Sequence, residues 1–163
     1  MEKKNECIFI SGIQDISERH FMEYYYPVLA EAVKDRERMY VMSDDDGTAV
    51  LAQIFLKHED LPEGKVLVFG LDESPKHYVS DKFIYIGGFK SIEERDAALT
   101  FASTHDLHVV FDGLGKDLVI NNLARRQTPL YDYKQYIEDP NSNQPFWTGM
   151  TTKENDVHGT LQN

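Results

Sequence analysis

The chain has 163 residues, of which 41% are hydrophobic and 28% charged, and its formal net charge at pH 7 is −11. These values fit one globular domain of ordinary size and exclude global disorder. The negative charge disfavours phosphate backbones and anionic membrane surfaces, so neither nucleic acid nor a membrane is a predicted partner. No apolar run reaches the roughly 18 residues of a membrane-spanning helix.

The N-terminus is polar, unlike a signal peptide, and the chain has a single cysteine, Cys7. Both features predict a cytoplasmic protein. Because Cys7 opens an apolar run, it is predicted to be a small core residue in preference to a reactive thiol.

Three short apolar runs in the first half of the chain, at residues 7–11, 39–42 and 66–69, predict buried strands. An apolar stripe at helical spacing follows the first strand, and Ser17 is its predicted N-cap. Pro27 falls inside this stripe. Either the helix is kinked there, or its regular part begins there.

A second amphipathic helix, ending near His58, follows the second strand. Residues 70–83 form a polar loop that is too long for a simple connector, and such loops in compact domains tend to be functional. Residues 83–86 predict a short extra strand. Ser91 and Glu94 match a capping box, which predicts the start of another helix.

A fourth strand of the parallel type is predicted at residues 107–111, a turn at 112–116 and a last helix at about 118–126. The predicted domain therefore spans residues 1–127. Residues 128–163 have no sustained periodicity and form an irregular acidic and aromatic tail, expected to pack on the domain or to be partly disordered.

The alternation of strands and helices predicts an α/β fold, a Rossmann-like parallel sheet of about four to five strands with helices on both faces. Right-handed crossovers would place the turns at residues 11–14, 43–48 and 112–116 outside the carboxyl ends of the strands, where such sheets bind ligands. Small residues and helix N-termini there favour a nucleotide or sugar-phosphate pocket. The alternative is that Gly and Asp are simply the usual residues of βα turns.

Four pieces of the chain, in this order, resemble one family: Ser11-Gly12, then residues 44–53, 87–100 and 112–126. Their order and spacing resemble the SLOG superfamily, the Rossmann-like group that contains the DNA-processing protein domain and the lonely-guy phosphoribohydrolases. The resemblance implies a nucleotide or nucleotide-derivative site built from the βα turns, and a homodimer. Some members of the family hydrolyse nucleoside monophosphates, and others resemble sensors of nucleotide signals.

The chain departs from the family's enzymes at their signature after the fourth strand, Pro-Gly-Gly-x-Gly-Thr-x-x-Glu. Aligned without a gap, Lys116 stands in the place of the Thr and Val119 in the place of the Glu. A shifted alignment puts Asn121 or Asn122 at the Glu position. Neither valine nor asparagine can act as a general acid or base, so the sequence leaves open whether the chain is an enzyme.

Arg95 matches an Arg that faces the phosphate in the family's enzymes. Its guanidinium could hold a phosphate, or it could pair with Asp96 or another carboxylate. Lys116, Arg125 and Arg126 are further candidates for contacting a phosphate.

Asp46 and Asp112 are the candidate catalytic carboxylates, and both could also bind a ribose. The full predicted ligand-binding set is Ser11, Gly12, Gln14, Asp46, Gly47, Arg95, Asp112, Gly113, Gly115, Lys116 and Asn122.

The acidic turn at residues 44–46 has two interpretations. Its carboxylates suit Mg²⁺, the one cofactor that the sequence suggests, or a ribose hydroxyl. Alternatively, the turn is solvated and caps the helix that follows. Histidines predict no metal site, because His105 and His108 are expected to straddle a helix end and a strand.

Three functions follow as hypotheses. The first is binding or sensing of a nucleotide or nucleotide-derived small phosphate at the carboxyl edge of the sheet. The second is a nucleotide N-glycosidase that uses Asp46 or Asp112 in place of the missing Glu. The third is a catalytically inert protein-interaction module that keeps the fold alone.

Overall fold

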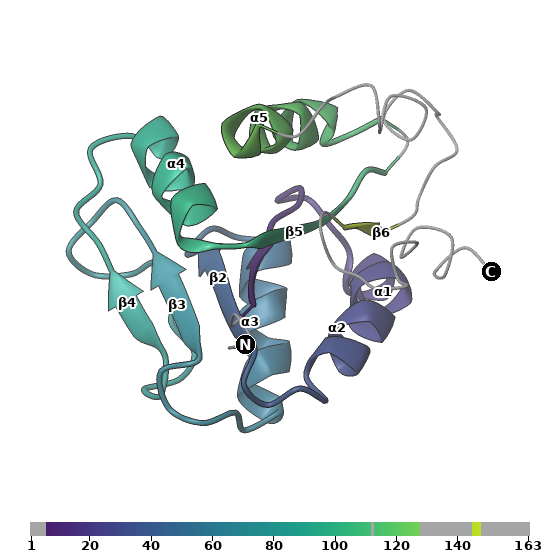
Figure 1. Ribbon diagram of the computed structural model, residues 1–163, viewed down its shortest axis with the longest axis vertical. Helices are drawn as coiled ribbons and strands as arrows, with labels where there is room; N and C mark the ends of the chain where they lie inside the picture. The colour runs from purple at the N-terminus through teal and green to yellow at the C-terminus, as the bar shows by residue number, and fades with distance from the viewer. Residues whose placement is uncertain (1–5, 112, 128–144, 148–163) are drawn as a thin grey trace, which may run out of the picture.

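In the computed structural model, residues 6–111, 113–127 and 145–147 are described, and they form one six-stranded sheet (Figure 1). The strand order is β4-β3-β2-β1-β5-β6. The first five strands are parallel: β1 (Cys7–Ile10), β2 (Met39–Ser43), β3 (Val66–Phe69), β4 (Ile84–Ile86) and β5 (His105–Val109). β6 (Pro145–Trp147) pairs antiparallel with β5. The predicted α/β, Rossmann-like parallel sheet is confirmed.

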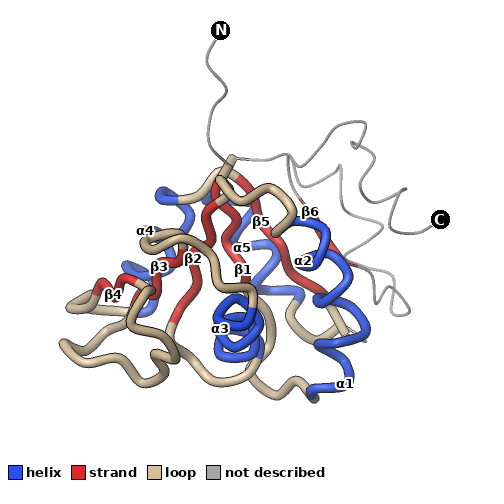
Figure 2. Tube along the Cα trace, turned by 90° about the horizontal axis from the view of Figure 1, so that it is seen from below, coloured by secondary structure: helices blue, strands red, loops and turns tan. Residues whose placement is uncertain are grey.

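Helical segments connect the strands. They are α1 (Glu18–His20), the π-helical turn η1 (Phe21–Tyr25), α2 (Tyr26–Ala32), α3 (Thr48–His58), α4 (Ile92–Ala102) and α5 (Lys116–Arg126). Figure 2 shows them distributed over both faces of the sheet.

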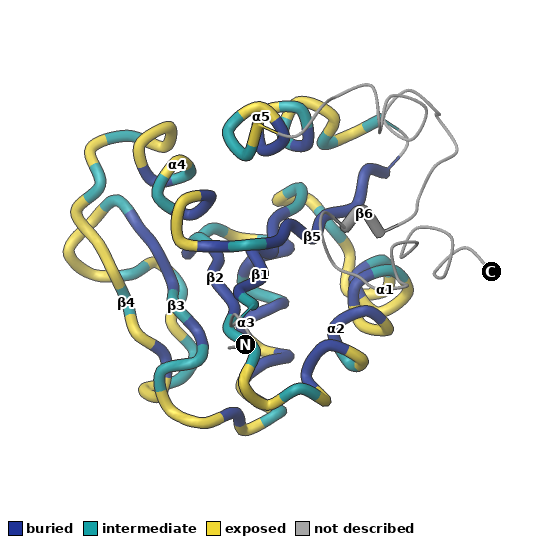
Figure 3. The backbone as a smooth tube through the Cα atoms, viewed as in Figure 1, coloured by how far each residue is buried: buried dark blue, intermediate teal, exposed yellow. Residues whose placement is uncertain are grey.

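Alternation along the strands assigns each side chain to one face. Ile8 and Ile10 of β1 join the main core with side chains of η1, α2 and α3. Cys7 and Phe9 point the other way and cluster with Leu99 of α4. The central strands are therefore buried on both faces, whereas β4 at the edge is largely exposed (Figure 3).

The structure bears out the second of the two alternatives for Pro27, a regular helix that begins there. Ser17 is the N-cap of α1, and the Ser17 hydroxyl accepts a hydrogen bond from the His20 amide at 3.0 Å. The chain then widens into η1, where the Tyr26 amide donates to the Phe21 carbonyl. Because proline has no amide hydrogen and its ring crowds the preceding turn, the regular helix restarts next to Pro27 as α2.

The last parallel strand was predicted two residues too late. It starts at His105, so His105 and His108 both lie in β5 on opposite faces, and the expectation that they straddle a helix end is wrong. The apolar pattern hid this start, because Asp106 and His108 are buried polar side chains whose partners lie on α5 or directly after β1. In addition, α5 begins at Lys116, not at residue 118.

Cys7 is buried, and burial raises the pKa of its thiol to about 11, as expected of a core residue.

No helix among the described residues is long and apolar enough to cross a membrane. The tail predicted at residues 128–163 lies outside the described residues, except for β6.

Candidate functional site

The three predicted turns meet at the carboxyl edge of the sheet. The Thr48 amide and hydroxyl both donate to the Ile13 carbonyl, at 3.3 and 2.9 Å. Gly47 (φ 82°) lies so close to the turn after β1 that a Cβ there would be 2.2 Å from the Gln14 carbonyl oxygen. A Cβ on Gly115, in the turn before α5, would be 3.2 Å from the Ile13 side chain. The turns therefore form one continuous surface.

Strand order reverses between β1 and β5, because the chain leaves β1 for β2 on one side and reaches β5 on the other. Ligands of open α/β sheets usually bind in the crevice at such a point. Here Tyr25 occupies it. Its hydroxyl donates to the Ser11 carbonyl at 2.8 Å and accepts from the Val109 amide at 2.9 Å. A Cβ on Gly12 would lie 2.3 Å from this hydroxyl, so the crevice is closed by close packing.

Aromatic rings extend this closure. The Phe111 ring stacks on His20, with centroids 5.0 Å apart, and meets the edge of Tyr24 at 5.4 Å. The β1–β5 crevice is therefore filled by the chain's own side chains.

A cavity of about 210 Å³ opens one strand away, at the ends of β1 and β2 beneath the start of α4. The apolar part of its lining consists of Phe9, Ile10, Ala49, Ile92, Leu99 and Leu118. The remaining lining residues are Ser11, Gly12, Gln14, Ser43, Asp45, Asp46, Arg95 and Asp96. We call this space the β1–β2 cavity.

Arg95 is buried in the wall of the β1–β2 cavity and held by two carboxylates. Its guanidinium contacts both oxygens of Asp45, at 3.1 and 3.3 Å, and Asp96 Oδ1 at 3.0 Å. Burial disfavours the charge on Arg95, but Asp96 and Asp45 outweigh this effect and raise its pKa. With Asp46, the lining carries three carboxylates against one guanidinium, so the cavity is acidic.

The long loop after β3 is held against the turn after β2 and against α3. Asp44 is buried, and its carboxylate accepts a hydrogen bond from the Lys76 amide at 2.8 Å. The buried Gln53 side chain holds the same loop at the His77 carbonyl and the Val79 amide, at 2.9 and 3.2 Å. The predicted functional loop is thus anchored beside the β1–β2 cavity.

The three consecutive aspartates diverge. Asp44 binds the loop backbone, Asp45 binds Arg95, and the largely exposed Asp46 pairs with the His77 ring. Among the described residues, no group of three or more carboxylate, histidine or cysteine side chains is arranged to hold a metal ion. Of the three aspartates, only Asp45 and Asp46 line the β1–β2 cavity.

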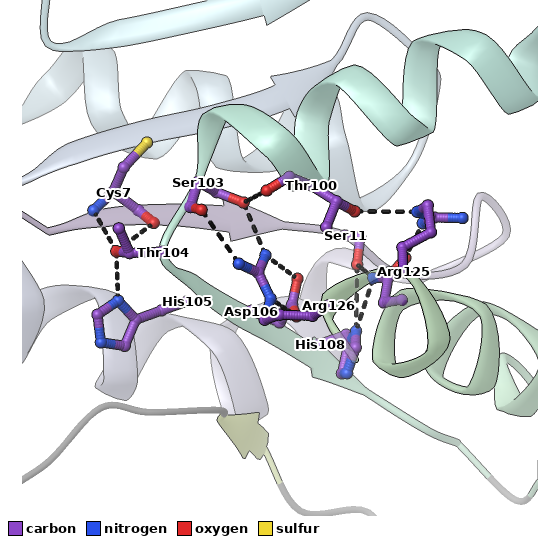
Figure 4. A network of polar contacts seen from close by, with 11 residues as sticks. Cys7, Ser11, Thr100, Ser103, Thr104, His105, Asp106, His108, Arg125 and Arg126 are labelled. Carbon is purple, nitrogen blue, oxygen red and sulfur yellow. Dashed lines mark hydrogen bonds and ion pairs between the residues drawn. The ribbon is translucent and has the colours of Figure 1, made fainter. Parts of the chain in front are cut away.

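Ser11 connects the β1–β2 cavity to a buried polar network (Figure 4). Its hydroxyl lies 3.2 Å from His108 Nδ1 and 3.3 Å from Asn122 Nδ2. Arg125 donates to Asn122 Oδ1 and, through Nε at 2.9 Å, to the Thr100 hydroxyl. The underside of the site is therefore polar and internally hydrogen-bonded.

Arg126 belongs to the same layer. It forms a two-pronged ion pair with the fully buried Asp106, at 2.6 and 3.0 Å, and donates to the Ser103 hydroxyl at 2.7 Å. Arg125 and Arg126, both predicted phosphate ligands, are thus committed to the packing of α5.

No protein-family model, curated protein or solved structure matches this chain. What the site can bind therefore follows from its own side chains.

Five predicted ligand-binding residues line the β1–β2 cavity: Ser11, Gly12, Gln14, Asp46 and Arg95. Five others are not among its lining residues: Gly47, Gly113, Gly115, Lys116 and Asn122. Asp112 lies outside the described residues. Ser43, Asp45 and Asp96 also line the cavity but were not in the predicted ligand-binding set. Asp45 and Asp96 directly adjoin Asp46 and Arg95 in the sequence, and Ser43 lies in the predicted turn at residues 43–48. Their closeness in sequence to Asp46 and Arg95 was the signal that could have added them to the predicted set.

A second concavity, of about 410 Å³, lies between the α1–η1–α2 segment and α3, away from the carboxyl edge. It is largely apolar, and its exposed side chains include Met22, Tyr26 and Ile54. We call it the η1–α3 groove.

Proposed function

We propose that the protein binds a nucleotide or a nucleotide-derived small phosphate at the carboxyl edge of its sheet, with the sugar part in the β1–β2 cavity. The observation that carries this proposal is the convergence of hydroxyl, amide and carboxylate side chains from two βα turns and α4 around one cavity. Carboxylates and hydroxyls accept hydrogen bonds from sugar hydroxyls, and the apolar wall can pack against the sugar carbons or a base.

The size of the cavity suits part of a nucleotide. Its volume of about 210 Å³ is below the roughly 300–1,000 Å³ of pockets that enclose whole ligands. A sugar-sized fragment would be enclosed, while the phosphate end would extend along the edge. Lys116 and the N-terminus of α5, which has no side-chain cap, lie on that edge and favour negative charge.

A second candidate is the N-glycosidase. Asp46 favours it, because this lining carboxylate is hydrogen-bonded to the His77 ring, and such a pair could transfer a proton. Val119, at the position of the family's Glu, is buried against Val110 and Leu123 and offers no such group. Product analysis by chromatography after prolonged incubation with each nucleotide separates binding from base release.

Thermal denaturation in the presence of candidate ligands tests the proposal. The ligands are nucleoside mono-, di- and triphosphates, cyclic nucleotides and ADP-ribose, each with and without Mg²⁺. A ligand at 100 times its dissociation constant should add about 2.7 kcal/mol to the free energy of unfolding. For a chain of this length that corresponds to a rise in Tm of several degrees. A flat result across the panel, with a folded protein, overturns the proposal.

A pair of variants locates the binding. Asp46→Asn removes a carboxylate that lines the β1–β2 cavity, and we expect it to change the ligand-induced rise in Tm. Asp15→Asn removes the same charge from an exposed residue of the neighbouring connection after β1 that does not line the cavity. Equal effects of the two variants would assign the response to overall charge and not to the cavity.

A further inference from the structure

The hydroxyl of Ser11 stands between two environments. On one side it lines the β1–β2 cavity, and on the other it meets His108 and Asn122, which are both fully buried. A serine hydroxyl carries one hydrogen and two acceptor lone pairs. The buried partners decide which of these remains for a ligand.

Arg125 fixes the orientation of the Asn122 amide. A guanidinium has only donors, so the oxygen atom that it contacts must be Asn122 Oδ1. The amide nitrogen Nδ2 therefore faces Ser11 Oγ at 3.3 Å and His108 Nδ1 at 3.4 Å, and it can only donate.

This orientation selects the form of His108. Asn122 Nδ2 can only donate, so its contact with His108 Nδ1 at 3.4 Å makes Nδ1 the acceptor nitrogen of the ring. Burial lowers the pKa of His108 to about 4, which keeps the ring neutral near pH 7. In the 3.2 Å contact between Ser11 Oγ and His108 Nδ1, the Ser11 hydroxyl therefore donates its hydrogen to Nδ1.

We infer that His108 and Asn122 lock the Ser11 hydroxyl as a hydrogen-bond acceptor toward the β1–β2 cavity, so that the site selects a ligand that presents a hydroxyl or amino hydrogen there. The Ser11 hydrogen is directed at His108, one lone pair receives Asn122, and the remaining lone pair is available to the cavity. His108 and Asn122 act as positioning residues and contact no ligand themselves.

The inference rests on the proposed function and names the portion of the ligand that is recognised. Asp45, Asp46 and Asp96 also present acceptors to the cavity, and Arg95 is engaged by Asp45 and Asp96. A phosphate offers acceptors and negative charge, whereas a ribose offers hydroxyl hydrogens. The β1–β2 cavity therefore recognises the sugar hydroxyls of the nucleotide, and the phosphate binds outside it.

Nitrogen-15 NMR of His108 tests the locked arrangement without any ligand. At pH 7 we expect the Nδ1 resonance in the range of an unprotonated imidazole nitrogen and the Nε2 resonance in that of a protonated one. A His108→Leu sample assigns the signal. A protonated Nδ1 overturns the inference, whatever the protein binds.

Fluorinated nucleotides test the recognition. The probes are the 5′-monophosphates of adenosine, guanosine, cytidine and uridine, each with ribose and as the 2′-fluoro and 3′-fluoro analogues. Fluorine has no hydrogen to donate, so replacing the hydroxyl that meets Ser11 should weaken binding about tenfold. If ribose and fluoro analogues bind equally, the inference fails and the proposed function stands. If no ligand of the thermal-denaturation panel binds, the proposed function fails as well.

Variants assign the preference to Ser11. Ser11→Ala should bind hydroxyl and fluoro ligands nearly equally, and so should His108→Leu, in which the Ser11 hydrogen is free to turn. Ser43→Ala removes the same group from another lining serine, whose hydroxyl donates to Asp45 at 3.1 Å, and should keep the preference. Loss of the preference in Ser43→Ala, or its persistence in Ser11→Ala, contradicts the assignment. Melting curves identify variants that do not fold. The comparison of ribose and fluoro nucleotides on the wild-type protein does not depend on any variant.

Discussion

Two places at the carboxyl edge of this sheet are built in opposite ways. The β1–β5 crevice, where strand order reverses, is closed by the Tyr25 hydroxyl against Gly12 and by the stacking of Phe111 on His20. The β1–β2 cavity, one strand away, is open and lined by both polar and apolar side chains. The two places share Ser11, whose carbonyl faces the crevice and whose hydroxyl lines the cavity and contacts the buried network.

The difference shows that topology determines where a ligand can bind, whereas side chains determine whether that place is open. Strand order determines which edge of the sheet can bind a ligand, because every βα turn lies there. Whether a given crevice is free depends on single residues from elsewhere, here a tyrosine of η1. The proposed ligand site is therefore displaced toward β2.

The largest expected effect comes from forcing the closed crevice apart. Gly12→Ala places a methyl group 2.3 Å from the Tyr25 hydroxyl and 2.5 Å from the Thr48 hydroxyl, which both hold backbone carbonyls. We expect a loss of about 3 kcal/mol in the free energy of unfolding, the upper end for overpacking. Urea denaturation measures it.

Gly88→Ala is the matched control. Gly88 has φ +89° but no neighbour within 4 Å of an added Cβ, so this variant carries only backbone strain, about 1 kcal/mol. An effect of Gly12→Ala no larger than that of Gly88→Ala would show that the crevice has spare room.

Lowering the pH should reduce the free energy of unfolding, because His108 is buried in its neutral form. His108 has a pKa of about 4 in the fold, below the ordinary 6.5, because burial disfavours its charged form and Arg126 adds to this, while Asp106 opposes it. Between pH 6.5 and 4 the unfolded chain binds more protons than the folded one, so stability falls as the pH falls. The total loss from this group approaches about 3 kcal/mol at pH 4 and below.

Urea denaturation of wild type and His108→Leu at pH 7, 6, 5 and 4.5 measures this contribution. The difference in unfolding free energy between the two proteins should shift in favour of the variant as the pH falls. A difference that stays constant would mean that His108 is not held neutral by burial.

A smaller effect is expected when only the hydroxyl in the crevice is removed. Tyr25→Phe leaves the Ser11 carbonyl and the Val109 amide without this partner and should lower the unfolding free energy by about 2 kcal/mol. Tyr26→Phe alters a partly exposed ring and should change it by less than about 0.5 kcal/mol. Nucleotide affinity should stay the same in both variants; a change in Tyr25→Phe would place the ligand in the crevice instead.

The sequence predicted the sheet well, because its central strands are short apolar runs and Ser17 and Ser91 are true helix caps. It also predicted the edge at which three turns meet. The start of β5 was missed, since Asp106 and His108 interrupt the apolar pattern and are buried only through partners such as Arg126 and Ser11.

The candidate site was predictable in part. Ser11, Asp46 and Arg95 were identified from turn and helix positions, and all three line the cavity. The pairing of Arg95 with Asp45, 50 residues apart, depends on how α4 crosses the sheet, and local patterns carry no such information. The closure by Tyr25 was equally hidden, because a tyrosine in an apolar helical stripe reads as an ordinary core residue.

Amide chemical-shift mapping tests the central claim most directly. A ¹⁵N-labelled sample is titrated with ADP-ribose and the four ribonucleoside 5′-monophosphates. The β1–β2 cavity predicts the largest shift changes at residues 11–14, 43–46 and 92–96. Changes confined to the η1–α3 groove, around Met22, Tyr26 and Ile54, or no changes with any of the five compounds, would contradict a nucleotide site at this edge of the sheet.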